Sequence, residues 1–424
     1  MTKTKKIITV VLSCVIFLAT FLVGFLIGRG TIDEDVATFN YIITHYKKYY
    51  YEETDDIIGV IEDALLDKYS EYYTKEEYEI VKSTAKGERE GVGFSYDKTT
   101  NTITQVLGNS PAKRAGVKEG GVIVGVGLTA DTIKTPSTEL SLSDILSEIP
   151  ANVDFVFRVD YGEEAKDYTV QKRKYLQTFV SYYDESGEYG FTGENDISFT
   201  KIGENTDYPL GDIKKTAVIK YTGFSGLGSG LKGSAGQFKK ALEKFKDSGK
   251  TNLILDIRNN GGGYMSILSS VAAHLINAEK DSKKLVSYAT YKDGKKDDFL
   301  SEAVDYSDYG FEKIIILANE NSASASEALI GAVLDYDKDN IVNVILDASV
   351  LNGEVVYKTY GKGIMQSTYD NILTGEAIKL TTAKIYWPKS NKSIHGVGVT
   401  ATLDERVLNA KGSNGFYDAL KLLK

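Results

Sequence analysis

The sequence has a single cysteine, three histidines and no excess of positive charge. Cys14 on its own excludes a disulfide framework and a cysteine-based zinc cluster. His45, His274 and His395 lie far apart in the chain and share no ligand spacing, so we expect neither a metal nor another cofactor. The formal net charge of −9 over 424 residues argues against a nucleic-acid partner, because phosphate-binding surfaces need a basic excess.

One long apolar run is present, and it lies at the N-terminus. Residues 7–27 contain no charged side chain and are about as many as a helix needs to span a bilayer. Lys3, Lys5 and Lys6 precede the run, which by the positive-inside rule keeps the N-terminus in the cytoplasm. No small-x-small cleavage site follows it. We therefore expect an uncleaved single-pass anchor in the cell membrane, with the rest of the chain extracytoplasmic.

This run leaves alternatives open. A cleaved signal peptide is one, and Cys14 in VLSC faintly resembles a lipoprotein site, although cleavage there would leave a further apolar stretch. Gly24 and Gly28 form a G-x-x-x-G pattern, which could pair two anchors into a homodimer.

Three regions of different character follow. Apolar residues recur at helical spacing over 36–46 and 57–65, and LLDKYSEYYTKEEY over 65–78 predicts a turn and a short acidic helix. From Gly91 the pattern is that of short strands, with helices expected over 111–115 and 143–149 and a strand over 154–159. Pro111 and Gly116 are typical start and stop residues of a helix.

After about Arg173, strands and helices alternate, which indicates crossover units and a largely parallel sheet. The expected strands cover 216–221, 252–257 and 314–317, and the expected helices cover 237–245 and 265–276. A polar stretch over 182–212, rich in glycine and aspartate, is expected to be a surface excursion.

The most informative stretch is IIILANENSASASEALIGAVLD, residues 314–335. An apolar strand is followed by three small hydroxyls, Ser322, Ser324 and Ser326, and then by a helical pattern. A serine at a strand-to-helix turn is held out from the backbone beside free helix N–H groups, which can stabilise an oxyanion. The alternative is that Ser324 and Glu327 form an S-x-x-E capping box and nothing more.

Two further stretches carry polar groups next to glycines. In LILDIRNNGGGYM, residues 253–265, a buried strand leads into glycines whose N–H groups can approach a ligand closely. In KTYGKGIMQ, residues 358–366, Lys362 lies between two glycines and Gln366 follows four residues later. A lysine can serve as the base for a serine when burial lowers its pKa from about 10.4 toward neutrality. The alternative for Lys362 is a simple turn residue.

A literal G-x-G-x-x-G occupies 228–233, and Asp256 ends the next strand, as in a nucleotide-binding fold. However, several residues separate this motif from the strand that ends at Tyr221, whereas the first glycine should close the strand. A flexible loop is the preferred interpretation, and a cofactor-dependent enzyme remains an alternative.

The region from Gly91 resembles a PDZ domain. Its carboxylate-binding loop would be Gly91, Val92, Gly93 and Phe94, followed by the phrase SPAKRAGV. Such a loop offers backbone N–H groups to the terminal carboxylate of a peptide. The sequence departs from the family at 120–121, where Gly-Gly replaces the usual Gly-Asp. A glycine-rich hairpin without function is the alternative.

Taken together, LLDKYSEYYTKEEY, the PDZ-like region, LILDIRNNGGG, NSASASE and TYGKGIMQ resemble the carboxy-terminal processing proteases, the tail-specific serine peptidases of family S41. The resemblance implies an α/β multidomain chain with a ClpP/crotonase-like peptidase core. It divides the chain into an anchor (1–30), a helical segment (31–86), a PDZ domain (87–172) and a peptidase domain (173–424).

The same resemblance assigns roles to residues. Ser324 would be the nucleophile, Lys362 the general base and Gln366 the residue that orients it, and Asp335 would have a structural use. The backbone N–H groups of Ala325, Gly262 and Gly263 would form the oxyanion hole. The sequence departs from the family at Gly261, where relatives have proline, and in an extra stretch over 347–358 that could shift Lys362 or merely lengthen a hairpin.

The expected function is a membrane-anchored serine endopeptidase that cleaves proteins near their C-termini and recognises exposed C-termini through the PDZ domain. The alternative is a catalytically inactive peptide- or ligand-binding protein on the same scaffold.

Overall fold

The computed structural model describes residues 33–49, 56–162, 164–191, 199–211, 213–351, 353–412 and 414–424. The predicted anchor lies outside these residues. In the part of the chain that is described, no helix is both long and apolar enough to cross a membrane. The chain divides into two compact units, Met1–Leu66 and Asp67–Lys424.

The first unit contains the helices α2 (Glu34–Tyr49) and α3 (Ile57–Leu65), which confirms the predicted helical spacing. The Asp56 side chain caps α3 by accepting a hydrogen bond from the N–H of Gly59. The second unit begins with β1 (Glu71–Tyr73) and α4 (Lys75–Ala85). The acidic helix was predicted, whereas the short strand before it was not.

An eight-stranded sheet forms the centre of the second unit, in the order β11-β10-β9-β12-β13-β16-β17-β22. Its strands are β9 (Val180–Asp184), β10 (Gly187–Phe191), β11 (Phe199–Gly203), β12 (Thr216–Tyr221), β13 (Asn252–Asp256), β16 (Lys313–Ala318), β17 (Val342–Leu346) and β22 (Val407–Asn409). From β12 to β22 neighbouring strands are parallel, as predicted.

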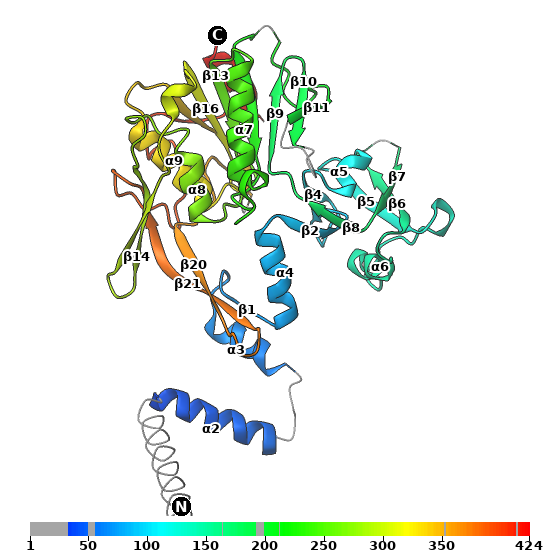
Figure 1. Ribbon diagram of the computed structural model, residues 1–424. Helices are drawn as coiled ribbons and strands as arrows, with labels where there is room; N and C mark the ends of the chain where they lie inside the picture. The colour runs from blue at the N-terminus through cyan, green and yellow to red at the C-terminus, as the bar shows by residue number, and fades with distance from the viewer. Residues whose placement is uncertain are drawn as a thin grey trace, which may run out of the picture. The chain divides into compact units, whose positions relative to one another are not determined.

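Helices cover both faces of this sheet, which is why its central strands are apolar throughout. The helices α7 (Ser234–Asp247), α8 (Met265–Ala272) and α9 (Ala325–Tyr336) share one buried cluster with alternate strand residues. Figure 1 shows α7 lying along the sheet. The intervening strand residues face α10 (Gly415–Leu422), which contributes Phe416 to a second cluster.

The surface excursion predicted over 182–212 is wrong where the structure has strands, at 182–184, 187–191 and 199–203. Strands β9, β10 and β11 form an antiparallel meander that extends the sheet beyond β12. Tyr182 and Tyr183 are at most 2% exposed, because one packs with each face of the sheet. The prediction gave weight to the polar composition and overlooked these aromatic residues.

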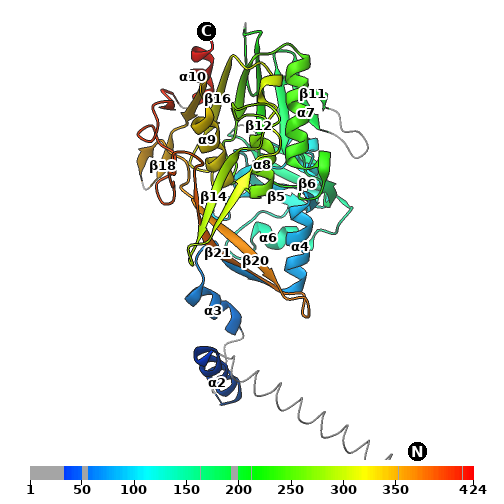
Figure 2. The ribbon, with the colours of Figure 1, turned by 60° about the vertical axis from the view of Figure 1, so that its left-hand side comes forward.

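A second sheet lies at the other end of the unit, in the order β1-β21-β14-β15, with β20 paired to β21 (Figure 2). Its strands are β14 (Leu285–Tyr291), β15 (Lys296–Leu300), β20 (Ile364–Asp370) and β21 (Ala377–Tyr386). In the extra stretch between Ser324 and Lys362, β18 (Ser349–Leu351) and β19 (Glu354–Val356) form a hairpin. This stretch therefore contains a hairpin.

The region over 88–171 has a hydrophobic cluster of its own, with Ile103, Phe155 and Phe157 almost fully buried. Its elements are β2 (Glu88–Gly91), β3 (Phe94–Tyr96), β4 (Ile103–Val106), α5 (Pro111–Ala115), β5 (Val122–Gly127), α6 (Leu142–Glu148), β6 (Asp154–Asp160) and β7 (Lys166–Gln171). The predicted helix at Pro111 ends where expected, at Gly116 with φ +84°. The strand β8 (Arg173–Leu176) pairs with β2 and leads into the large sheet.

Three short 3₁₀ helices complete the second unit: η1 (Ala130–Thr132), η2 (Gly230–Lys232) and η3 (Tyr306–Asp308). The glycine-rich 228–233 motif contains η2. Just before it, the N–H groups of Gly226 and Leu227 both donate to the Ala85 carbonyl of α4, at 2.9 Å. The glycine segment is therefore packed against the end of a helix. Asp256, the residue expected to hold a ribose, instead accepts hydrogen bonds from Tyr208 and Arg258, so this arrangement does not support the cofactor alternative.

Candidate active site

The three clustered serines have different environments. The hydroxyl groups of Ser322 and Ser326 are fully buried and donate to the carbonyls of Ile257 and Asn260, each at 2.8 Å. These bonds fasten the turn to the end of β13. The Ser324 oxygen takes part in a capping box with Glu327 at the start of α9, and among the described residues its hydroxyl has no recorded acceptor. The structure therefore leaves Ser324 as the serine that is available for chemistry.

Ser324 is the N-cap of α9 and has φ +58° and ψ −113°. A non-glycine residue with positive φ is strained, and such strain persists where the surroundings impose it. One contact that holds this turn in place is the hydrogen bond from the Ala323 N–H to the Asn260 carbonyl at 3.0 Å. The sharp strand-to-helix turn predicted from the sequence is thus observed between β16 and α9.

Glu327 connects the serine turn to the lysine loop. Its Oε2 accepts hydrogen bonds from the N–H groups of Ser324 at 2.8 Å and Lys362 at 2.9 Å. Its Oε1 accepts one from the Gly361 N–H at 2.8 Å and another from the Thr359 hydroxyl. Burial raises the pKa of Glu327, and these four donors act against that rise. From the sequence, Glu327 could be recognised only as a helix cap, because Gly361 and Lys362 are distant in the chain.

Lys362 is half-buried, and burial is the main cause that lowers its pKa below 10.5. The positive charge of Lys379 acts in the same direction. The amine lies 4.8 Å from the centre of the Tyr69 ring. No hydrogen bond from Lys362 Nζ to Ser324 Oγ, or to any other group in the described ranges, is recorded. The backbones of the two residues are tied together, while the bond between their side chains is not formed.

Gln366, predicted to orient Lys362, faces a different partner. Its Nε2 donates to the Thr381 hydroxyl across the β20–β21 pair at 3.1 Å. The structure therefore makes Gln366 the third residue of β20 and does not bring its amide to the lysine. Asp335 accepts hydrogen bonds from the N–H groups of Lys389 and Ser390, both at 2.9 Å, which is a structural use.

The predicted oxyanion hole is partly occupied by internal hydrogen bonds. The Gly262 N–H donates to Asn260 Oδ1 at 2.9 Å. For the N–H groups of Gly263 and Ala325, the described part of the chain offers no recorded acceptor, so these two remain as donors. Gly262 nevertheless packs against the serine turn, since an added Cβ there would lie 2.9 Å from both Ser324 Cβ and Ala325 N.

Substitution of Gly262 tests how much the serine turn depends on this contact. At φ +97° an added methyl group would lie 2.6 Å from the Ala323 carbonyl oxygen, so the turn must shift. We expect Gly262→Ala to lower the cleavage rate by about 100-fold, the order of loss from a misplaced reacting group. Gly261→Ala is the matched control, because nothing lies within 4 Å of a Cβ there. Equal rates in both variants would contradict the importance of the contact.

The Arg258 side chain holds the end of β13 from which the glycine loop begins. Its Nε donates to Asp256 Oδ1 at 3.0 Å, and its Nη1 donates to Asp347 and Asn414, each at 2.8 Å. Burial would raise the pKa of Asp256, but the Arg258 charge lowers it overall. This network joins the ends of β13 and β17 to the start of α10 and so fixes the base of the loop.

The predicted carboxylate-binding loop joins β2 to β3. Gly93 has φ +85°, and an added Cβ would lie 2.2 Å from Ser110 Cβ, so only glycine fits. The carbonyls of Val92 and Gly93 accept hydrogen bonds from Ala112 and Leu107. Their N–H groups have no recorded acceptor within the described ranges. These two N–H groups are therefore available as backbone donors. Gly91 ends β2 and Phe94 begins β3.

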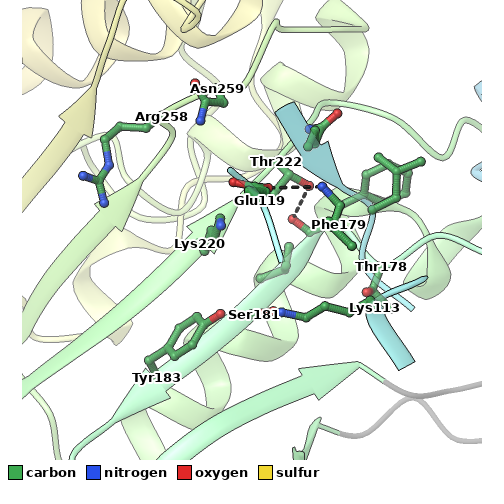
Figure 3. A pocket seen from close by; sticks show the side chains of 15 residues that line it. Lys113, Glu119, Thr178, Phe179, Ser181, Tyr183, Lys220, Thr222, Arg258 and Asn259 are labelled. Atoms are coloured by element: carbon green, nitrogen blue, oxygen red, sulfur yellow. Dashed lines mark hydrogen bonds between the residues drawn. The ribbon is translucent and has the colours of Figure 1, made fainter. Parts of the chain in front are cut away.

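A small cavity of about 50 Å³ separates this region from the large sheet (Figure 3). Its wall combines Lys113 and Glu119 with Lys220, Arg258 and Asn259. Asn259 in turn bonds Asn319, which begins the loop that leads to Ser324. This cavity could not be predicted from the sequence, because its walls come from distant segments.

Three features of the described residues define a serine hydrolase type of site: a serine on a strand-to-helix turn whose hydroxyl has no recorded acceptor, backbone donors beside it, and a half-buried lysine. The family comparison agrees: residues 215–404 match the model of peptidase family S41. The chain therefore contains a peptidase S41 domain, which confirms the resemblance to that family.

Curated relatives and a solved structure extend this match. The chain is 28% identical over 384 residues to a probable CtpA-like serine protease of Staphylococcus aureus, covering 88% of this chain and 65% of the relative. It is 27% identical over 362 residues to a protein of the same description from Staphylococcus saprophyticus, covering 83% of this chain and 61% of that one. These matches support a serine-type peptidase, although the chain spans less than two thirds of the relatives' length.

A putative S41 protease from Bacteroides fragilis matches the fold with a TM-score of 0.51 and 16% sequence identity. The match covers 88% of this chain and 90% of that one. The shared architecture therefore extends beyond the peptidase domain.

Proposed function

We propose that this protein is a membrane-anchored, extracytoplasmic serine endopeptidase that cleaves protein substrates near their C-termini with a Ser324–Lys362 pair. The observation that carries the proposal is the single buried carboxylate of Glu327, which accepts hydrogen bonds from the N–H groups of both residues. A glutamate that served only as a helix cap would need the bond from Ser324 but not the bond from Lys362. The family match supports the reaction class.

The proposed reaction begins when the neutral Lys362 amine takes the proton of the Ser324 hydroxyl. The serine oxygen attacks the scissile carbonyl, and the resulting oxyanion is stabilised by the N–H groups of Ala325 and Gly263. The Lys362 ammonium then protonates the leaving amine, and water hydrolyses the acyl-enzyme by the same path. The lysine amine must swing from the Tyr69 ring to the serine, which its flexible stem permits.

Recognition of the substrate end is assigned to the 87–172 region, acting as a PDZ domain. The free N–H groups of Val92 and Gly93 suit a terminal carboxylate. The cavity of Figure 3 supports a link to the active site, because its wall runs from Lys113 to Asn259 and hence toward the serine loop. The membrane anchor and the extracytoplasmic location rest on the 1–30 sequence alone.

A cleavage assay with two forms of one unfolded substrate tests the proposal. The full chain in detergent should cut the form with a free C-terminus close to its end, as mapped by mass spectrometry, and cut the C-terminally amidated form more slowly. A fluorophosphonate probe should label Ser324 in the same preparation. A folded protein that neither cleaves nor is labelled would favour the peptide-binding alternative. Equal cleavage rates for both forms would contradict recognition of the C-terminus but would still support the peptidase activity.

A further inference from the structure

The Lys362 amine rests against an aromatic ring from a distant part of the chain. Its Nζ lies 4.8 Å from the centre of the Tyr69 ring, within the range at which a ring face attracts a cation. Tyr69 belongs to the LLDKYSEYYTKEEY segment, which predicts a turn and a short acidic helix and gives no role to this tyrosine. The ring is the nearest recorded contact of the amine.

The surrounding hydrogen bonds hold Tyr69 in place. Its N–H donates to Asp67 Oδ1 at 3.0 Å, and the next residue, Ser70, accepts a hydrogen bond from the Thr381 N–H of β21 at 3.0 Å. Its hydroxyl lies 3.4 Å from the hydroxyl of Tyr360, two residues before the lysine. The ring is thus fixed both to β21 and to the loop that carries Lys362.

We propose that Tyr69 is a positioning residue for the general base, with its ring shielding the Lys362 amine from water in the resting position that it holds before it turns to the Ser324 hydroxyl. The inference rests on the proposed Ser324–Lys362 mechanism and extends it to a segment outside the matched 215–404 domain.

The ring has two opposing effects on the lysine. Its negative face attracts the ammonium, which favours the charged form, whereas its bulk excludes water, which favours the neutral form. The pKa of Lys362 is lowered overall, with burial as the largest cause, so the exclusion of water dominates.

Charged groups around the amine also contribute to its titration. Lys379 on β21 lowers the pKa of Lys362 further, whereas Tyr360, Asp67 and Glu327 raise it. Lys68 lies 4.9 Å from the Tyr69 ring and donates to the Tyr360 hydroxyl. Tyr69→Ala and Tyr69→Phe both lose the bond between the Tyr69 and Tyr360 hydroxyls, so a change in the lysine that only Tyr69→Ala shows can be assigned to the ring.

The test compares the pH dependence of cleavage in Tyr69→Ala and Tyr69→Phe. Removal of the ring lets water reach the ammonium and raises the pKa of Lys362. We expect the rising limb of the Tyr69→Ala profile to move up by about one pH unit, which is roughly a tenfold loss of rate at neutral pH. Tyr69→Phe keeps the ring and should keep the wild-type limb. Tyr72→Phe is the control, because it removes a hydroxyl that bonds Glu376 instead.

A second measurement does not depend on catalysis. In the Ser324→Ala background, the pH dependence of Lys362 acetylation by acetic anhydride, followed by mass spectrometry, reports the titration of the amine directly. Tyr69→Gln replaces Tyr69→Ala if the latter does not fold. An unshifted limb together with unshifted acetylation in the ring-deleted variant overturns the inference. A wild-type protein that never cleaves would instead defeat the proposed function, and acetylation would still decide the role of Tyr69.

Discussion

Lys362→Arg should abolish cleavage as completely as Ser324→Ala, with a rate lowered by about four orders of magnitude or more, as for the loss of a nucleophile or its base. Arginine keeps the positive charge and the long stem, but it stays protonated and cannot accept the serine proton. A lysine that served only as a structural cation would tolerate this change. The two variants therefore separate a general base from a turn residue.

The measurement is the initial cleavage rate, together with labelling of Ser324 by a fluorophosphonate. Labelling should fall in Lys362→Arg as well, because an unactivated serine reacts slowly. Lys384→Met on β21 is the matched control, since Lys384 is exposed and lies in the strand opposite Ile364. A Lys362→Arg variant that cleaves at more than about a hundredth of the wild-type rate would contradict the assignment of the base.

Glu327→Gln should lower both activity and stability. A glutamine amide has only one acceptor oxygen. Its NH₂ group would therefore face two of the four donors that now bond the Glu327 carboxylate. Each buried donor left without a partner costs about 1–3 kcal/mol. We expect a loss of about 2–4 kcal/mol in the free energy of unfolding and a rate lowered by about 100-fold, because Ser324 and Lys362 lose their common tie.

The capping box of α4 provides the matched control for this change. Glu77 accepts a hydrogen bond from the Thr74 N–H at 2.9 Å, the same N-cap-to-carboxylate bond that Glu327 accepts from Ser324, but on the surface. Glu77→Gln should leave cleavage unchanged and move the melting temperature little. If Glu327→Gln behaved in the same way, Glu327 would be a helix cap only. Chemical denaturation and cleavage rates on the same samples measure both quantities.

The sequence was most informative where a feature is local. The alternation of strands and helices after Arg173, the helix at Pro111 and the turn at Ser324 were all predicted from neighbouring residues, and the structure has them. The meander β9–β11 was misread because its strands are short and polar outside. Whether residues are buried there depends on the neighbouring sheet, which composition does not report.

The active site could be predicted only in part for the same reason. Ser324 and Lys362 stand in distinctive local phrases, whereas Glu327 was visible only as a cap, since its bonds to Gly361 and Lys362 cross between segments. The contact of Tyr69 with Lys362 spans almost the whole second unit. The occupied N–H of Gly262 likewise depends on a side chain, Asn260, that local pattern cannot orient.

The hairpin β18–β19 has a consequence for how related chains are compared. Val350 and Val355 on it are 75% and 61% exposed, and the chain that follows it is fixed by hydrogen bonds to the Glu327 carboxylate. Residues can therefore be gained or lost there at small entropic expense, without moving the reacting groups. The number of residues between the NSASASE and TYGKGIMQ motifs is therefore a poor measure of how closely two chains are related. A reporter or affinity tag inserted in this hairpin should leave the cleavage rate unchanged.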